Sequence, residues 1–158
     1  ADGSAERVRA LLAAGADVEG SSTDDVPPLH SACTLGHQEV VRLFLDAKAD
    51  VNRQDDQSLT PMLSAAFQGH VEVVRLLCGV RADTNIADVE GWTPLYVAAF
   101  MGSPPVARIL LEASCDPTQP TRDGSTPMDA AIHEDHEEVR ILLSEVLDAD
   151  SSRSIRGR

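Results

Sequence analysis

The chain has few aromatic side chains and little positive charge. Its 158 residues include three Phe, one Tyr and one Trp, and 13 Lys and Arg stand against 26 Asp and Glu, for a formal net charge of −13. A nucleic-acid-binding protein needs a basic surface to replace condensed counterions, so this balance argues against that class. It also disfavours binding to anionic membrane surfaces. A basic partner is the natural complement.

Long apolar runs and paired cysteines are absent as well. No apolar run reaches the roughly 18 residues that span a bilayer, so direct membrane insertion is not expected. The three cysteines, Cys33, Cys78 and Cys115, lie far apart with no C-x-x-C pair. An odd number without a framework predicts reduced thiols and an intracellular location. The cytoplasm is the simplest compartment, and an organellar assembly is also open.

One string of residues returns along the chain at a fixed interval. Residues 60–77 read TPMLSAAFQGHVEVVRLL, and similar strings begin at positions 27, 93 and 126. The four starting positions, 27, 60, 93 and 126, are therefore spaced 33 residues apart. Residues 3–18 fit the back half of the same unit in the same phase. A fixed period of this length is typical of a stacked-repeat solenoid.

The third unit illustrates the local structure that the string predicts. Thr60 can cap a helix, and Pro61 fits the first helical position, where its missing N–H is no loss. Gly69 ends this short helix, since a residue with positive φ often follows a helix. Val and Leu then recur at helical spacing over residues 71–77, which predicts a second helix. Each unit is therefore a polar turn, a short helix, a tight turn, a longer helix and a loop.

These strings closely resemble the ankyrin repeat. The resemblance rests on GWTPLYVAA (91–99), GHVEVVRLL (69–77) and GADV (15–18), and it covers about residues 3–147. It implies an all-α ankyrin-repeat solenoid of stacked helix-turn-helix units with β-hairpin fingers, in about four and a half repeats. The expected units are a truncated first repeat (1–23), repeat two (24–56), repeat three (57–89), repeat four (90–122), a C-terminal capping repeat (123–149) and a disordered or partner-bound basic tail (150–158).

The chain departs from the family pattern at the start of each unit. In the family, a T-P-L-H string couples its Thr and His by a hydrogen bond, and no unit here has both residues. Repeat two keeps the histidine and lacks the threonine, and the other units show the reverse. Each unit is expected to lose a bond worth on the order of 1 kcal/mol. The residue pairs at these positions are Pro27 and His30, Thr60 and Leu63, Thr93 and Tyr96, and Thr126 and Asp129.

The first unit is expected to hold only its second helix, over about residues 5–14. Val8, Leu11 and Leu12 are expected to pack on repeat two. The sequence shows no polar capping repeat that would cover the far side of this helix. Because the end of a repeat stack needs a polar outer face, further repeats or a neighbouring subunit are expected to cover this edge.

The resemblance implies that partners bind in the concave groove lined by finger tips and first helices. The same few positions of successive units hold the only Trp and two of the three Phe. Aromatic anchors dominate interfaces, so these positions predict one continuous apolar patch for a partner. The alternative is that the aromatic rings pack on neighbouring fingers and hold them in place. The patch consists of Leu35, Leu59, Phe67, Trp92, Phe100 and Met101.

Acidic residues flank this patch on the expected fingers. They predict a partner segment that carries a basic residue beside a hydrophobic anchor. A solvated rim that keeps the protein soluble explains them equally well. The candidate residues are Asp24, Asp56, Asp88 and Glu90.

Catalytic and metal-binding patterns are weak. The string HEDHEE (133–138) suggests a metal site, but His136 takes the turn position that His37 and His70 hold in other units. The glycines are spaced as helix ends and not as a phosphate-binding loop, and no nucleophile–base motif appears. The sequence thus predicts a non-catalytic protein–protein interaction module or scaffold with no cofactor and no metal. A structural subunit of a large assembly, or the adaptor arm of a longer enzyme or channel, remains the alternative.

Overall fold

The structure, a computed structural model, describes residues 3–20 and 26–156. Within these ranges the chain forms helices joined by turns and loops, with no β-strand. The helices are α1 (Gly3–Ala13), α2 (Pro28–Thr34), α3 (Gln38–Asp46), α4 (Pro61–Phe67), α5 (Val71–Gly79), α6 (Pro94–Phe100), α7 (Pro104–Glu112), α8 (Pro127–His133) and α9 (Glu137–Arg156).

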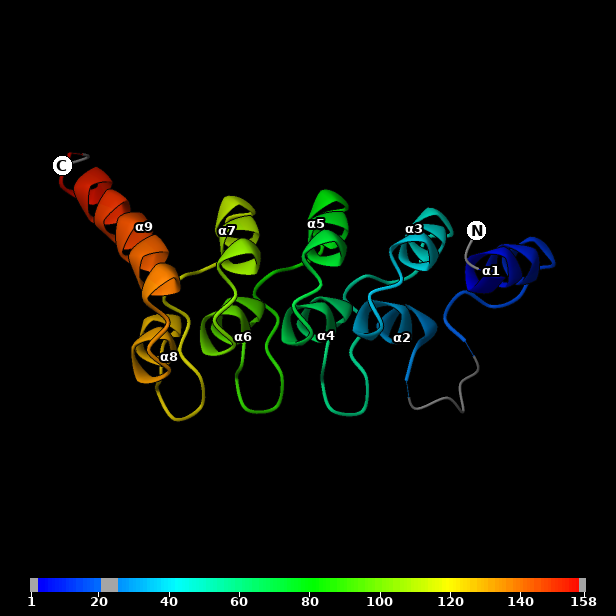
Figure 1. The fold of residues 1–158 in the computed structure, drawn as a ribbon, viewed down its shortest axis with the longest axis horizontal. Helices are drawn as coiled ribbons and strands as arrows, with labels where there is room; N and C mark the ends of the chain where they lie inside the picture. The colour runs from blue at the N-terminus through cyan, green and yellow to red at the C-terminus, as the bar shows by residue number, and fades with distance from the viewer. Residues whose placement is uncertain (1–2, 21–25, 157–158) are drawn as a thin grey trace.

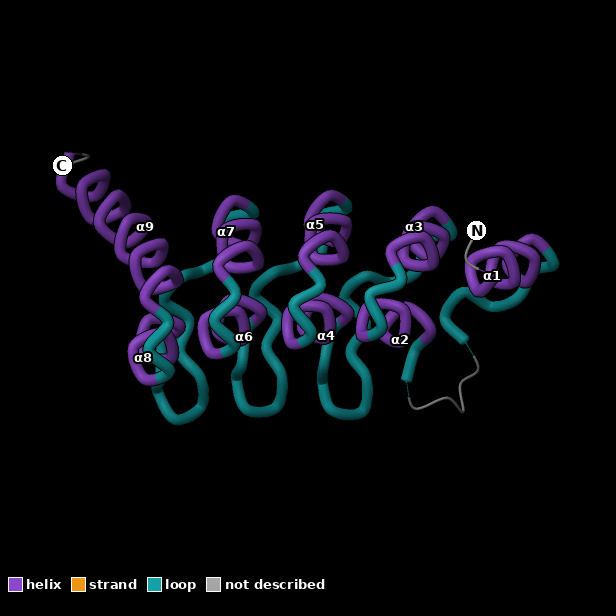
Figure 2. Tube along the Cα trace, in the orientation of Figure 1, coloured by secondary structure: helices purple, strands orange, loops and turns teal. Residues whose placement is uncertain are grey.

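The helices form two rows, as Figure 1 shows. The short helices α2, α4, α6 and α8 make one row, and α3, α5, α7 and α9 make the other. The loops that precede α4, α6 and α8 project together beyond the short helices (Figure 2). Each inner helix pair therefore contacts a neighbouring pair on both sides, and the stack is the all-α solenoid that the sequence predicts.

Threonine side chains cap the N-termini of the short helices α4 and α6. The hydroxyls of Thr60 and Thr93 accept hydrogen bonds from the backbone N–H groups of Leu63 and Tyr96, each at 3.2 Å. A proline follows each threonine and starts the helix. These caps satisfy N–H groups that have no partner inside the helix, and the loss of one costs about 1 kcal/mol.

Each short helix ends at a tight turn that also joins neighbouring repeats. Gly36 adopts a φ of +69°, and a Cβ there would lie only 2.7 Å from the imidazole of His70. The Nε2 of His70 is 3.0 Å from the carbonyl oxygen of Thr34, which can only accept, so the imidazole donates. His136 makes the equivalent bond to Phe100 at 3.1 Å. The structure therefore confirms the turn histidine as a structural residue.

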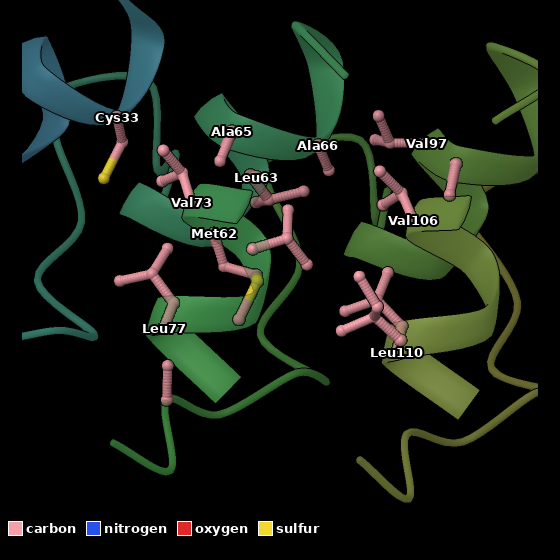
Figure 3. Packing of buried hydrophobic residues seen from close by; sticks show 14 of the residues in the cluster. Cys33, Met62, Leu63, Ala65, Ala66, Val73, Leu77, Val97, Val106 and Leu110 are labelled. Atoms are coloured by element: carbon pink, nitrogen blue, oxygen red, sulfur yellow. The ribbon is translucent and has the colours of Figure 1, made fainter. Parts of the chain in front are cut away.

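The hydrophobic core lies between the two rows of helices. Figure 3 shows buried side chains of α4 and α5, among them Met62, Leu63 and Leu77, which have no exposed surface. Burying one such side chain stabilises the fold by roughly 1.5–3 kcal/mol. Cys33 and Cys115 belong to this core, and burial raises the pKa of each thiol to about 12. Both cysteines are thus inert packing residues at neutral pH.

The projecting loops are tight turns, and β-hairpin fingers are not confirmed. We call residues 55–59, 88–92 and 121–125 the finger loops. Two backbone bonds hold each loop, for example from the N–H of Asp55 to the carbonyl of Leu59 and from the N–H of Ser58 to the carbonyl of Asp55, both at 3.0 Å. The carboxylate of Asp55 also accepts from Gln57 and Leu59. Because the aspartate takes these N–H groups within a few residues, no ladder of strand bonds develops.

The two ends of the described chain differ from the expectation. At α1, Val8 and Leu12 pack against the core, but Leu11 is 59% exposed, so its predicted packing is wrong. At the other end, α9 continues through Arg156, where the sequence predicted a disordered or partner-bound basic tail over residues 150–158. Residues 137–156 contain no Gly or Pro, so nothing in the backbone stops the helix there.

The expected loss of a Thr–His bond is seen in repeat two and compensated in repeat five. His30 bonds the carbonyl of Leu59 through Nε2 at 2.8 Å, but its buried Nδ1 has no partner. Pro27 has no hydroxyl to offer, and burial lowers the pKa of His30. In α8, Asp129 instead accepts bonds from the N–H and hydroxyl of Thr126, which completes a capping box. The prediction of a lost bond is therefore wrong for repeat five.

Candidate functional site

Four aromatic residues come together beside the finger loop at 88–92. The ring centroids of Trp92 and Phe67 are 6.0 Å apart, and Trp92 lies 5.0 Å from both Tyr96 and Phe100. We call these four residues the aromatic cluster. The carboxylate of Asp88 accepts from the backbone N–H of Trp92 at 2.9 Å and holds this residue in place. Aromatic side chains of two helices and one loop thus support one another across a repeat interface.

The rings of Phe67, Trp92 and Phe100 are half-buried and pack against the core. Trp92 therefore contacts both Phe rings, and all three residues still keep part of their surface in solvent. Met101 directly follows Phe100 and is 50% exposed.

The other two predicted apolar residues are Leu35 and Leu59. Leu35 follows α2 and is exposed, and Leu59 is half-buried in its finger loop. Between Leu35 and Met101 in the repeat register stands Gln68, a polar and exposed residue. The apolar surface at the helix ends is consequently interrupted at repeat three.

The predicted acidic residues occupy different environments. Asp56 and Glu90 are exposed on the finger loops. Asp88 is half-buried, and its Oδ1 accepts from the N–H groups of Glu90 and Trp92. The structure therefore shows Asp88 shaping its own loop. Asp24 lies outside the described residues.

A pocket of about 390 Å³ opens between α6, α8 and the finger loop at 121–125. Of the lining residues, Phe100 belongs to the predicted apolar patch, whereas Tyr96 and Asp129 were not predicted to line a site. The repeat register contained a signal, because residues 33 apart lie at the same place in adjacent units and so across one interface. Tyr96 and Asp129 are such a pair. The main lining residues are Tyr96, Phe100, Asp123, Asp129, His133 and Glu134.

Hydrogen bonds keep two pocket carboxylates ionised. Asp123 accepts from the hydroxyl of Thr121 at 2.5 Å and from the N–H of Ser125 at 3.0 Å, and these bonds lower its pKa. The bonds from Thr126 lower the pKa of Asp129 in the same way. Both groups therefore carry full negative charge at neutral pH.

The third carboxylate, Glu134, lies next to a histidine and near a tyrosine. Its Oε1 is 2.7 Å from the Nδ1 of His133, whose side chain is largely exposed. Burial raises the pKa of Tyr96, and the charges of Asp123, Asp129 and Glu134 raise it further. The pocket is thus negative, with a neutral phenol in its wall.

The residues that the structure describes show neither a metal-binding group nor a membrane-spanning helix. No group of three or more His, Cys, Asp or Glu side chains is arranged to hold a metal ion there. No helix in those ranges is long and apolar enough to cross a membrane.

Comparison with known proteins identifies the repeat. A family model described as ankyrin repeats (3 copies) matches residues 1–55, 48–121 and 80–154. These overlapping matches cover nearly the whole chain. No curated protein matches it.

Proposed function

This chain belongs to the ankyrin repeat family, and from that premise we propose that it binds another protein through its finger loops and short helices, without catalysis. Ankyrin repeats are generally protein–protein interaction modules. We call the surface formed by the finger loops and by α4, α6 and α8 the groove face. The family alone does not identify the partner, because one fold serves many functions.

The aromatic cluster is the observation that carries this proposal. Trp, Tyr and Phe anchors dominate binding energy at protein interfaces, and the chain has few of them. Its only Trp and its only Tyr, with two of its three Phe, meet at this one place. Exposed Met101 extends the apolar surface next to them.

Rigidity and charge support the same proposal. The finger loops are held by their own aspartates, and the N–H of Arg122 bonds the carbonyl of Glu90 at 2.9 Å, which links two neighbouring loops. A preorganised surface loses little ordering entropy on binding. With Asp56 and Glu90 exposed beside the cluster, the complementary partner segment has a hydrophobic anchor flanked by basic residues. The proposed setting is intracellular, in keeping with three cysteines that form no disulfide.

The test compares capture of partner proteins by matched variants. Trp92→Ala removes the centre of the cluster, and Met101→Gln introduces the residue that repeat three carries at the same place. Val80→Gln is the control, because Val80 is similarly exposed but follows α5 in the other row of helices. A protein that binds through the groove face is captured by the wild type and by Val80→Gln and is lost with the other two variants.

The affinity is then measured with the purified partner. We expect Trp92→Ala to weaken binding by at least about 30-fold, since central aromatic anchors contribute roughly 2 kcal/mol or more. Met101→Gln has a smaller effect in the same direction. Unchanged affinity in both variants, with melting shown to remain cooperative, would refute the groove face as the binding surface.

A further inference from the structure

We propose that the pocket between α6 and α8 receives an arginine side chain of the partner protein. The inference rests on the proposed function, because it assigns a chemistry to one part of the groove face. The pocket volume of about 390 Å³ falls in the lower part of the range for ligand sites, roughly 300–1,000 Å³. Its walls combine aromatic rings with three carboxylates, and these two features together select the ligand.

The carboxylates give the pocket uncompensated negative charge. Asp123, Asp129 and Glu134 are each held through one oxygen by a neighbouring residue, which leaves the other oxygen to accept a bond from a ligand. Within the described ranges, no Lys or Arg forms an ion pair with any of them. A cation that enters the pocket is therefore attracted by three charges at short range.

Tyr96 adds a hydrogen-bonding group to the aromatic wall of the pocket. The residue is only 8% exposed, and it lines the pocket. Its ring lies at a tilt against Trp92, and its backbone N–H donates to the hydroxyl of Thr93. Among the described residues, its own hydroxyl is not one of the buried polar atoms that lack a partner, so it is accessible to solvent or to a ligand. A guanidinium N–H in the pocket can donate to it, because the neutral phenol oxygen can accept.

The aromatic rings favour arginine over lysine. A guanidinium is planar, stacks on aromatic faces and forms paired hydrogen bonds with carboxylates. The ring of Phe100 lines the pocket, and Trp92 packs behind it with a centroid distance of 5.0 Å. An ammonium group is a compact point charge that is strongly hydrated, and it uses neither the flat ring nor the separated carboxylates as well.

The equivalent place one repeat earlier lacks this chemistry. Glu90 stands where Asp123 does, but Tyr96 replaces Asp129 and Met101 replaces Glu134. One carboxylate is then present in place of three. The arginine site is therefore specific to the junction of the last two repeats, and the earlier junction is left for apolar contacts.

The direct test uses N-acetyl-arginine amide as the probe, titrated into the full chain and followed by two-dimensional NMR and by fluorescence of the single tryptophan. We expect a dissociation constant of about 1 mM, with shifts centred on Tyr96, Phe100 and Glu134. The matched probes are N-acetyl-lysine amide and N-acetyl-citrulline amide. We expect lysine to bind at least about threefold more weakly, and citrulline, which has no charge, at least about tenfold more weakly.

Near-isosteric variants test the residues. Glu134→Gln introduces the amide that repeat three carries at this place, and we expect it to weaken probe binding about five- to tenfold. Tyr96→Phe removes only the hydroxyl, and we expect a loss of about threefold. The control is Asp46→Asn, which removes one negative charge from an exposed carboxylate of α3, in the other row of helices, and is expected to alter binding by less than about twofold.

Three outcomes overturn the inference: no shifts at the pocket, equal binding of citrulline, or equal binding of lysine. An equal effect of Glu134→Gln and Asp46→Asn also overturns it, because general electrostatics then accounts for the attraction. The proposed function is judged separately by partner capture. Capture that depends on Trp92 while the probe fails to bind refutes the arginine pocket alone, and a bound probe with capture independent of Trp92 refutes the groove face alone.

Discussion

Helices α4 and α8 have the same length and the same Thr-Pro start, but they are buried to different extents. In α4, all residues from Pro61 to Ala66 are buried, whereas in α8 only Pro127, Ala130 and Ala131 are. The reason is position, because α4 contacts both α2 and α6 and α8 contacts only α6 among the short helices. A helix with a described neighbour on each side is thus mainly a packing element, and α8 leaves more of its side chains exposed.

The same contrast appears on the groove face. The position held by Leu63 in α4, where it is fully buried, is held by Asp129 in α8, where it is exposed and caps the helix. Similarly, Phe67 belongs to the aromatic cluster while His133 in the same place is exposed and lies beside Glu134. Repeats with one backbone plan therefore present an apolar surface in the middle of the stack and an acidic one at its end.

The largest expected effect contrasts the two regions by truncating an apolar side chain in each. Leu95→Ala in α6 removes a fully buried side chain and is expected to lower the free energy of unfolding by about 2–5 kcal/mol. Ile132→Ala in α8, where the side chain is 54% exposed, is expected to cost less than about 1 kcal/mol. Urea unfolding followed by circular dichroism measures both. Equal costs would show that the last repeat is packed as tightly as the middle.

A smaller difference is expected between two turn glycines. Gly69 and Gly102 have nearly the same positive φ, so replacement of either by Ala costs about 1 kcal/mol of backbone strain. A Cβ at Gly69 would meet nothing within 4 Å, but one at Gly102 would overlap the imidazole of His136. We therefore expect Gly102→Ala to cost about 1–3 kcal/mol more than Gly69→Ala.

The control for this pair comes from the sequence itself. Repeat four carries Ser103 where repeat five carries His136, which is why the space beside Gly69 is open. In a His136→Ser background, the costs of the two alanine variants should converge. If the difference persists, the imidazole is not its cause.

The smallest expected effect is a pH dependence at repeat two. Burial lowers the pKa of His30 below its ordinary value of 6.5, so below that pH the unfolded chain binds the proton more readily than the folded one. The contribution of neutral His30 to the free energy of unfolding is constant above about pH 7. It is lost as the pH falls from 6.5 through the pKa of the folded state, with a slope of at most about 1.4 kcal/mol per pH unit.

The matched variant is His30→Leu, which introduces the residue of repeat three. The other histidines are common to both proteins, so the difference in their free energies of unfolding between pH 5 and pH 8 isolates His30. We expect the wild type to lose stability relative to His30→Leu as the pH falls. Parallel pH profiles would contradict this account of the buried imidazole.

Much of the fold was predictable because its signals are local. Thr60 and Gly69 act on the few residues beside them, and the structure confirms both helix boundaries. The gathering of Phe67, Trp92 and Phe100 also followed from the register. The exposure of Leu11 could not be predicted from the register. It depends on how α1 is rotated against α3, and the sequence of one repeat holds no information on that rotation.

The candidate site was predictable only in part. Asp129 stands where the family pattern has a histidine, and the sequence predicted only the loss of a hydrogen bond there. In the structure, Asp129 caps α8 and also lines the pocket. Residue type at one position did not reveal this double role, because it depends on Thr126 in the same helix and on Tyr96 in the neighbouring repeat. The predicted binding residues themselves stay a prediction until the variants are measured.

The repeat period, the helix pairs and the strong excess of negative charge follow from local and bulk properties of the chain, because caps and turn residues act locally and composition acts in bulk. Which of these residues meet depends on how the repeats pack in space. Tyr96, Asp123 and Glu134 come from two helices and a loop, and they share one pocket because adjacent repeats stack at a particular offset. That offset is set by the side chains packed between the helices, and it converts scattered carboxylates and a buried phenol into a single negatively charged site.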